Sequence, residues 1–182
     1  RPGPRGLQAV MSGAATITAL REAGLTCAAA ESLTGGMVCA ALSEVPGSSA
    51  VFRGGAVTYT VAAKQRVLGV PPALLAELGP VDPQVALLMA RGVAGLLAAD
   101  VAVATTGVAG PAPHGGHDPG VAFIAWAAPH EAGVVEVHVD GGRESVRTVV
   151  THTALTVIRL VARDGDVDLD QLSVRAKRAD RE

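Results

Sequence analysis

The sequence predicts an α/β fold, a single layered α/β/α domain with a mixed sheet. Short apolar segments bounded by glycine or proline alternate with longer segments of helical periodicity, which is the order of units with parallel strands. The last two strand-like segments follow one another directly and predict a hairpin, so the sheet is expected to be mixed. Apolar residues make up 49% of the 182 residues, which is enough for the core of one domain.

Capping residues mark where several of the expected helices begin and end. Ser12 is a candidate N-cap for the first helix, and Gly24 is its stop. Pro72 suits the first turn of a short helix, and Asp82 followed by Pro83 opens the longest periodic segment. In chain order, the expected helices cover residues 12–23, 33–45, 62–68, 71–77, 83–99 and 143–162.

Apolar runs and turn residues mark the expected strands. Gly54 and Gly55 interrupt a run of strand-forming residues, which predicts a bulge or the close approach of another backbone. A continuous apolar run indicates a buried strand at 101–105, and a loop rich in glycine and proline follows it over 107–119. In chain order, the expected strands cover residues 25–30, 51–60, 101–105, 121–128 and 134–139.

The ends of this pattern divide the chain into three parts. Residues 1–11, which run from Arg1 up to Met11, are expected to be a disordered leader or one added for expression. Residues 12–163 are expected to form the domain, and the polar and charged residues 164–182 a frayed tail.

Composition excludes several classes of function. A net charge of −2 and only 2% aromatic residues argue against binding of nucleic acid. Cys27 and Cys39 lie in apolar surroundings without CxxC spacing, as small buried thiols in a reducing compartment do. No apolar run reaches the length of a membrane span and no signal peptide is evident, so we expect a cytoplasmic protein without a membrane partner.

The most informative stretch is Ala-Glu-Ser-Leu-Thr-Gly-Gly at residues 30–36. It lies between an apolar strand-like run and a helical run, so Ser32 is expected on a tight turn at the edge of a sheet and at the start of a helix. An anion forming beside Ser32 would be stabilised there by the helix dipole and by unpaired backbone N–H groups. Two interpretations stay open, an N-cap serine in an ordinary turn and a catalytic nucleophile.

A serine nucleophile needs a base, and the sequence offers one candidate. No histidine and aspartate make a convincing pair, and Lys64 is the only lysine before Lys177. A lysine acts as a base only when burial or a neighbouring cation lowers its pKa. Tyr59, the only tyrosine, is expected at a strand end, where its hydroxyl could relay a proton. The alternatives are an exposed surface lysine and a packing aromatic.

Two further segments could contact a ligand. The loop from Thr105 to Pro111 is not a P-loop, because no Gly-Lys-Ser/Thr follows it. Just beyond it, in the 107–119 loop, His114-Gly-Gly-His117 invites a metal site, but no third or fourth ligand accompanies the pair, which favours a solvated loop. Arg143 and Arg147 share a helix face and could bind a phosphate, or could be a solvated charged face.

With these segments in this order, the chain closely resembles the CinA C-terminal domain family, also called PncC-type nicotinamide-nucleotide amidohydrolases. The resemblance covers residues 14–160. The matching pieces are Ala-Glu-Ser-Leu-Thr-Gly-Gly at 30–36, Pro-Gly-Ser-Ser-Ala-Val-Phe at 46–52, Gly-Ala-Val-Thr-Tyr at 55–59, Lys64, Leu-Gly-Val at 68–70, Thr-Gly-Val-Ala-Gly-Pro at 106–111 and Gly-Arg-Glu-Ser-Val-Arg at 142–147.

The resemblance implies a compact α/β domain, a homo-oligomer, that hydrolyses the carboxamide of nicotinamide mononucleotide to nicotinic acid mononucleotide and ammonia in pyridine nucleotide salvage. It implies Ser32 as nucleophile, Lys64 as base and Tyr59 as an aid to proton transfer, with no metal or organic cofactor. The residues that it implies for substrate binding are Thr34, Gly35, Gly36, Thr105, Thr106, Gly107, Gly110 and Arg143, the last for the phosphate.

Three positions depart from the family pattern. Val61 stands where an asparagine is common, Asp118 where a lysine is usual, and Gly142 where an aspartate is usual. Asp118 puts a negative charge in the substrate loop, which would weaken the binding of an anionic nucleotide. The alternative function is therefore a catalytically weak or inactive nucleotide-binding module of the competence/damage-inducible CinA family.

Overall fold

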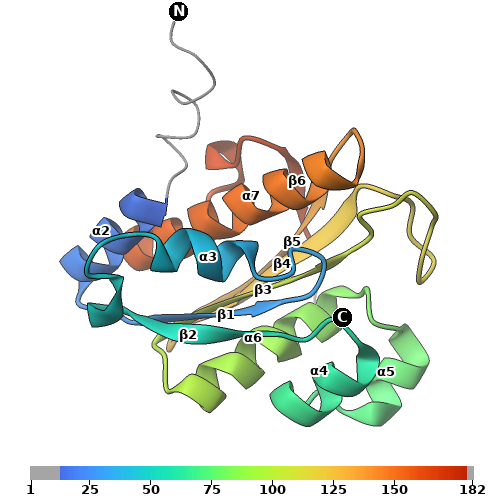
Figure 1. The fold of residues 1–182 in the computed structure, drawn as a ribbon, viewed down its shortest axis with the longest axis horizontal. Helices are drawn as coiled ribbons and strands as arrows, with labels where there is room; N and C mark the ends of the chain where they lie inside the picture. The colour runs from blue at the N-terminus through green and yellow to red at the C-terminus, as the bar shows by residue number, and fades with distance from the viewer. Residues whose placement is uncertain (1–12, 180–182) are drawn as a thin grey trace, which may run out of the picture.

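The computed structural model describes residues 13–179, which form a six-stranded mixed sheet covered by helices on both faces (Figure 1). The leader and the proposed cap Ser12 lie outside these residues. In chain order, the helices and strands are α2 (Gly13–Ala23), β1 (Cys27–Glu31), α3 (Met37–Ser43), β2 (Phe52–Val57), α4 (Val61–Leu68), α5 (Pro72–Leu78), α6 (Pro83–Leu97), β3 (Val101–Gly107), β4 (Val121–Ala127), β5 (Ala132–His138), α7 (Arg143–Asp164) and β6 (Arg175–Arg178). Short 3₁₀ helices lie at Ser48–Ala50 and Leu169–Gln171.

The sheet has the order β2-β1-β3-β4-β5-β6. Strand β1 is parallel to both of its neighbours, β2 and β3. From β3 to β6, each strand is antiparallel to the next one in the sheet. The layered α/β fold with a mixed sheet is therefore confirmed. Glu31 pairs with Val57 on one side and with Thr105 on the other, so the carboxyl ends of three parallel strands meet at one edge. That edge is where open α/β sheets bind ligands.

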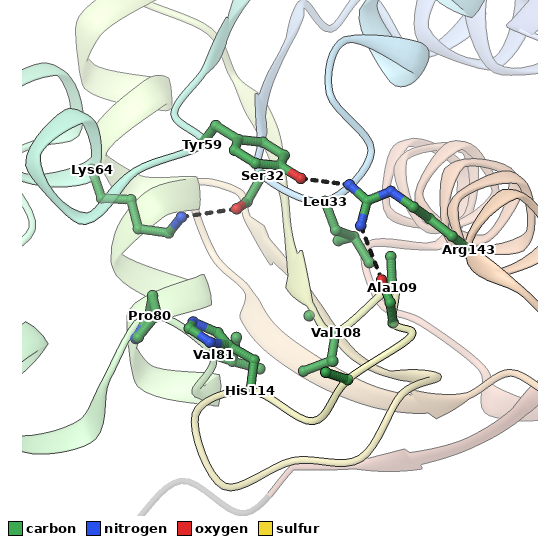
Figure 2. Close-up of a pocket in the computed structure, with 13 residues that line it drawn as sticks. Ser32, Leu33, Tyr59, Lys64, Pro80, Val81, Val108, Ala109, His114 and Arg143 are labelled. Atoms are coloured by element: carbon green, nitrogen blue, oxygen red, sulfur yellow. Dashed lines mark hydrogen bonds between the residues drawn. The ribbon is translucent and has the colours of Figure 1, made fainter.

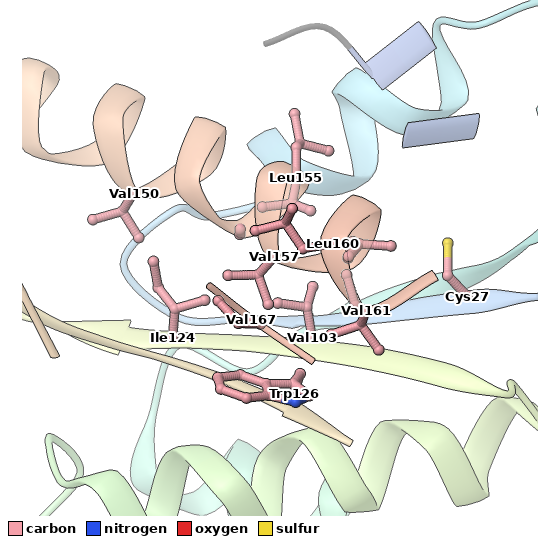
Figure 3. Close-up of a cluster of buried hydrophobic side chains, with 14 of the residues drawn as sticks. Cys27, Val103, Ile124, Trp126, Val150, Leu155, Val157, Leu160, Val161 and Val167 are labelled. Carbon is pink, nitrogen blue, oxygen red and sulfur yellow. The ribbon is translucent and has the colours of Figure 1, made fainter. Parts of the chain in front are cut away.

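Two apolar clusters hold the layers together. One fills the space between the sheet and α2, α3 and α7, and includes Trp126 and Ile124 of β4 together with Val157 and Leu160 of α7 (Figure 3). The other joins the opposite face to α5 and α6 and to the end of α4. All seven residues of β4 are buried, as its continuous apolar sequence predicts for a strand covered on both faces.

Helix α4 lies directly against α6. A Cβ atom at Gly92 of α6 would collide with the carbonyl oxygen of Leu68, the last residue of α4, so the two backbones touch there. Thr60 caps the start of α4, where its hydroxyl accepts a hydrogen bond from Ala63 N–H at 3.1 Å. These two contacts fix the helix that carries Lys64.

The structure bears out some boundaries and corrects others. Asp82 caps α6 as expected, and a register shift opposite Arg53 gives β2 its predicted bulge. The helix expected from residue 33 is wrong in its first turn, because residues 33–36 form turns. The frayed tail is also wrong for residues 175–178, which form β6 and pair with β5.

Strand β6 is held by charge as well as by its backbone. Arg178 donates a hydrogen bond to Asp166 at 2.7 Å, and its guanidinium lies 4.7 Å from the ring centre of Trp126. Lys177 pairs with Glu136 of β5 at 3.2 Å. Among residues 13–179, no helix is both long enough and apolar enough to span a membrane.

Candidate active site

The turn that follows β1 is held in place from two directions. Ser32 N–H donates to the carbonyl of Thr105 on β3 at 2.9 Å. From α7, Arg147 donates to the carbonyl oxygens of Leu33 and Thr34, both at 3.0 Å. Arg147 was expected either to be solvated or to bind a phosphate, but it instead supports the serine turn. Ser32 itself is buried.

Glu31, and not Ser32, caps α3. The Glu31 carboxylate is fully buried and accepts hydrogen bonds from the N–H groups of Gly36, Val38 and Cys39 at 2.8–3.1 Å. The N-cap interpretation of Ser32 is wrong, because α3 begins only after Gly36, whose φ of 101° needs a glycine. Since Glu31 already takes these amide groups, the start of α3 is not an open anion site.

Lys64 is buried and directed at Ser32. Only 1% of Lys64 is exposed, and its Nζ donates hydrogen bonds to Ser32 Oγ and to the Thr58 carbonyl, each at 2.9 Å (Figure 2). The interpretation of Lys64 as an exposed surface lysine is therefore wrong. Burial lowers the pKa of Lys64 from 10.5 to about 8, and no carboxylate within residues 13–179 forms an ion pair with it.

Tyr59 is paired with Arg143 and not with the serine. Arg143 Nη2 donates to the Tyr59 hydroxyl at 2.6 Å, and Arg143 Nη1 donates to the Gly110 carbonyl at 3.2 Å. Within the described residues, Tyr59 makes no hydrogen bond to Ser32 or Lys64, and 55% of it is exposed. The structure thus brings Ser32 and Lys64 together and leaves Tyr59 beside them (Figure 2).

These groups border a cavity of about 200 Å³. Its wall is about equally polar and apolar, and no carboxylate contributes to it. It is lined by Ser32, Leu33, Tyr59, Lys64, Pro80, Val81, Gly107, Val108, Ala109, Gly110, Ala112, His114 and Arg143. A cavity of this size is large enough for a small ligand group, and the rest of a larger ligand would remain at its mouth.

The expected substrate-binding residues divide into two sets. Gly107, Gly110 and Arg143 do border the cavity. The others lie outside its lining. Thr34 and Thr105 are buried and share a hydrogen bond between their hydroxyl groups at 2.8 Å.

The remaining three expected residues are Thr106, Gly35 and Gly36. The Thr106 hydroxyl donates to the Pro80 carbonyl at 2.7 Å, and Gly35 and Gly36 belong to the turn in front of α3. None of these three residues lines the cavity.

Sequence reasoning missed part of the wall. Val108 and Ala109 belong to the loop that the sequence already marked for ligand contact. Ala112 and His114 follow it in the same glycine-rich segment, and that position was a usable signal. Pro80 and Val81 precede α6, and Leu33 follows Ser32; nothing in their residue types marks them. Of the departures from the family pattern, neither Val61 nor Asp118 lines the cavity.

The two loop histidines do not form a metal site with other ligands. Within residues 13–179, no group of three histidine, cysteine, aspartate or glutamate side chains is placed to hold a metal ion. His114 and His117 instead pair through their backbones as a small hairpin.

Together, the fold and the site define an α/β/α domain with a buried serine–lysine pair at the carboxyl edge of its parallel strands. The family described as CinA C-terminal domain matches residues 11–162, and this chain belongs to that family. A CinA-like protein of Geobacter sulfurreducens is 46% identical over 142 residues, which is 76% of this chain and 34% of the relative. The chain thus spans about a third of the length of the curated relatives it matches.

Solved structures agree with this assignment. A CinA superfamily protein of Klebsiella pneumoniae is 28% identical with a TM-score of 0.79, and the match covers 82% of this chain and 94% of that one. A competence/damage inducible protein of Agrobacterium tumefaciens is 39% identical with a TM-score of 0.75, over 79% of this chain and 89% of that one.

Proposed function

We propose that this domain is an amidohydrolase that converts nicotinamide mononucleotide to nicotinic acid mononucleotide and ammonia. The observation that carries the proposal is the buried hydrogen bond between Lys64 Nζ and Ser32 Oγ at 2.9 Å, at the wall of a cavity. A serine becomes a nucleophile when an adjacent base takes its proton. A lysine whose pKa is lowered to about 8 supplies that base.

The geometry supports a two-step reaction. Neutral Lys64 keeps one N–H on the Thr58 carbonyl and accepts the proton of Ser32, whose oxygen then bonds to the amide carbon. The protonated Lys64 gives its proton to the amide nitrogen of the tetrahedral intermediate, the C–N bond breaks, and the nitrogen leaves as ammonia. Water, deprotonated by the same lysine, then cleaves the acyl-enzyme ester and restores the Ser32 hydroxyl.

Backbone amide groups of the serine turn are suited to hold the oxyanion. Within residues 13–179, the N–H groups of Leu33 and Thr34 make no hydrogen bond, whereas that of Ser32 is taken by Thr105. The two carbonyl contacts of Arg147 keep this turn in one conformation. Preorganised donors of this kind contribute a large part of the rate of acyl transfer.

Tyr59 and Arg143 are proposed to act at the mouth. Arg143 is exposed and bidentate in character, so it is suited to the phosphate of the substrate. A phosphate on Arg143 would compete with the Tyr59 hydroxyl for the same N–H groups. Tyr59 would then be released toward Ser32 and Lys64, where it could assist the proton transfer.

Ammonia release from nicotinamide mononucleotide tests the proposal. We expect turnover by the native chain and a loss of about 10³-fold or more in Ser32→Ala and Lys64→Met. Ser43→Ala, which removes an exposed serine from α3, is the matched control and should retain full activity. The kcat/KM should rise about tenfold per pH unit up to about pH 8 and then level, because only neutral Lys64 is active.

A nucleotide-binding module without catalysis is the rival. Tyr59 favours it in one respect, since it is bound to Arg143 and not to the serine–lysine pair. Binding of nicotinamide mononucleotide without any ammonia release would support that rival and reject the amidohydrolase.

A further inference from the structure

The His-Gly-Gly-His segment of the loop is a rigid hairpin that presents one histidine to the cavity. We propose that His114 is a specificity-determining residue that donates a hydrogen bond to an anionic group of the substrate, a phosphate above all. The inference rests on the proposed function for the substrate, but the hairpin, the cavity and the unpaired ring are independent of it.

The hairpin geometry is fixed by its backbone. His114 and His117 exchange two N–H···O hydrogen bonds, at 3.0 and 3.1 Å. Gly115 and Gly116 between them have φ angles of +60° and +80°, and two successive positive φ angles are those of a type I′ turn. Side chains other than glycine are strained at such positions, so this turn depends on its glycine pair.

The hairpin is also anchored to the rest of the fold. The ring of His117 packs edge-on against Phe123 of β4, with ring centres 5.3 Å apart and planes at 76°. On the other side, Gly115 lies beside Val81, at a spacing where an added Cβ atom would make an ordinary van der Waals contact of 3.6 Å. One histidine therefore holds the hairpin while the other is free to meet a ligand.

His114 has no partner of its own. Across residues 13–179, its ring makes no hydrogen bond and no ion pair, and it borders the cavity beside Val81 (Figure 2). An imidazole offers at least one N–H donor in either protonation state, so the ring can donate whether neutral or charged. An exposed, unpaired donor on an anchored turn is suited to a substrate and does nothing for the fold.

The charges of the cavity indicate what His114 binds. The basic groups that line it are Lys64, His114 and Arg143, and none of its lining residues is acidic. Asp118, which follows the hairpin, lies outside the lining. Because Lys64 must be neutral to act as base, His114 and Arg143 remain as the donors for an anion. They belong to different elements, the loop hairpin and α7, and each presents its donors to the cavity.

Paired substrates and paired variants test this role. The substrates are nicotinamide mononucleotide and nicotinamide riboside, which differ by the phosphate alone. For the mononucleotide, His114→Ala should raise KM about 10-fold and leave kcat within about twofold, as expected for one charge-assisted hydrogen bond. His114→Gln keeps an N–H donor and should lose less. For the riboside, neither variant should change KM.

The control is His130→Ala, another exposed histidine. It follows β4, whose last residue Ala127 pairs with Ala102 at the start of β3, so it lies at the end of the sheet away from the cavity. This variant should behave as the native chain. Equal losses for both substrates, or an unchanged KM for the mononucleotide in His114→Ala, would overturn the assignment.

Binding separates this inference from the proposed reaction. Titration calorimetry of nicotinamide mononucleotide uses Ser32→Ala as the background, with inorganic phosphate as competitor. We expect a Kd about 10-fold weaker when His114→Ala is added, and weaker competition by phosphate in that variant than in the Ser32→Ala background. If ammonia release is absent but this dependence is found, the amidohydrolase fails and the His114 assignment stands. An unchanged Kd with normal turnover rejects His114 and keeps the enzyme.

Discussion

Replacement of Lys64 by methionine should change how the stability of the domain depends on pH. Methionine has a similar length and no charge, so Lys64→Met removes the titrating group from a site that is 1% exposed. The substitution also leaves Ser32 Oγ and the Thr58 carbonyl without a donor, which alters stability at every pH. The informative quantity is therefore the difference between native and variant as pH rises.

The size of that difference follows from the pKa of Lys64. A fall from 10.5 to about 8 means that the buried cation destabilises the fold by about 3 kcal/mol at neutral pH. Between these two values the unfolded chain binds more protons than the folded one, so the free energy of unfolding rises with pH. From about pH 7 to about pH 9, the free energy of unfolding of the native chain should rise by about 1 kcal/mol relative to that of Lys64→Met.

Guanidinium denaturation of both proteins at the two pH values measures this gain. Burial raises the pKa of Cys27 to about 12 and also raises that of Cys39, so both thiols lower stability at alkaline pH, but equally in native and variant. Lys177→Met is the control, since 65% of the Lys177 side chain is exposed and it should give no such slope. If the native chain and Lys64→Met differ in free energy of unfolding by the same amount at both pH values, then burial does not lower the pKa of Lys64.

Two further substitutions test the supports of the site and the sheet. Glu31→Gln should lower the free energy of unfolding by about 2 kcal/mol, because a neutral amide replaces a buried carboxylate with three N–H donors, whereas exposed Glu77→Gln should change it little. Denaturation curves for both variants decide this, and equal stabilities would contradict the capping role. Arg178→Ala should uncover the ring of Trp126, the only tryptophan, and shift its fluorescence to longer wavelength; an unchanged spectrum would mean that β6 does not cover it.

Local signals predicted most of the fold. The cap at Asp82, the bulge that precedes Gly54 in β2 and the uninterrupted apolar run of β4 each depend on neighbouring residues alone. Strand β6 could not be found in this way, because Arg-Ala-Lys-Arg at 175–178 looks like a solvated tail. It becomes a strand through partners far away in the sequence, the backbone of β5 and the ring of Trp126.

The candidate site was predictable in its parts and not in its connections. Ser32 and Lys64 could be paired because strand ends at one edge converge, and an isolated lysine after such a strand is unusual. Tyr59 was expected to assist proton transfer between Ser32 and Lys64 because it lies near them. Its hydroxyl is instead bound by the guanidinium of Arg143, which comes from α7. Likewise, Ser32 and Glu31 are both good capping residues, and only the three-dimensional path of the turn decides between them.

The contact between α4 and α6 places a constraint on evolution at a residue that no ligand would touch. Gly92 leaves room for the end of α4, and Lys64 reaches Ser32 from the preceding turn of that same helix. A single added methyl group at this position would push the helix outward and lengthen the contact between Lys64 and Ser32. A survey of tolerated substitutions would then group Gly92 with the serine–lysine pair, although it lies on another helix and its side chain is a single hydrogen atom.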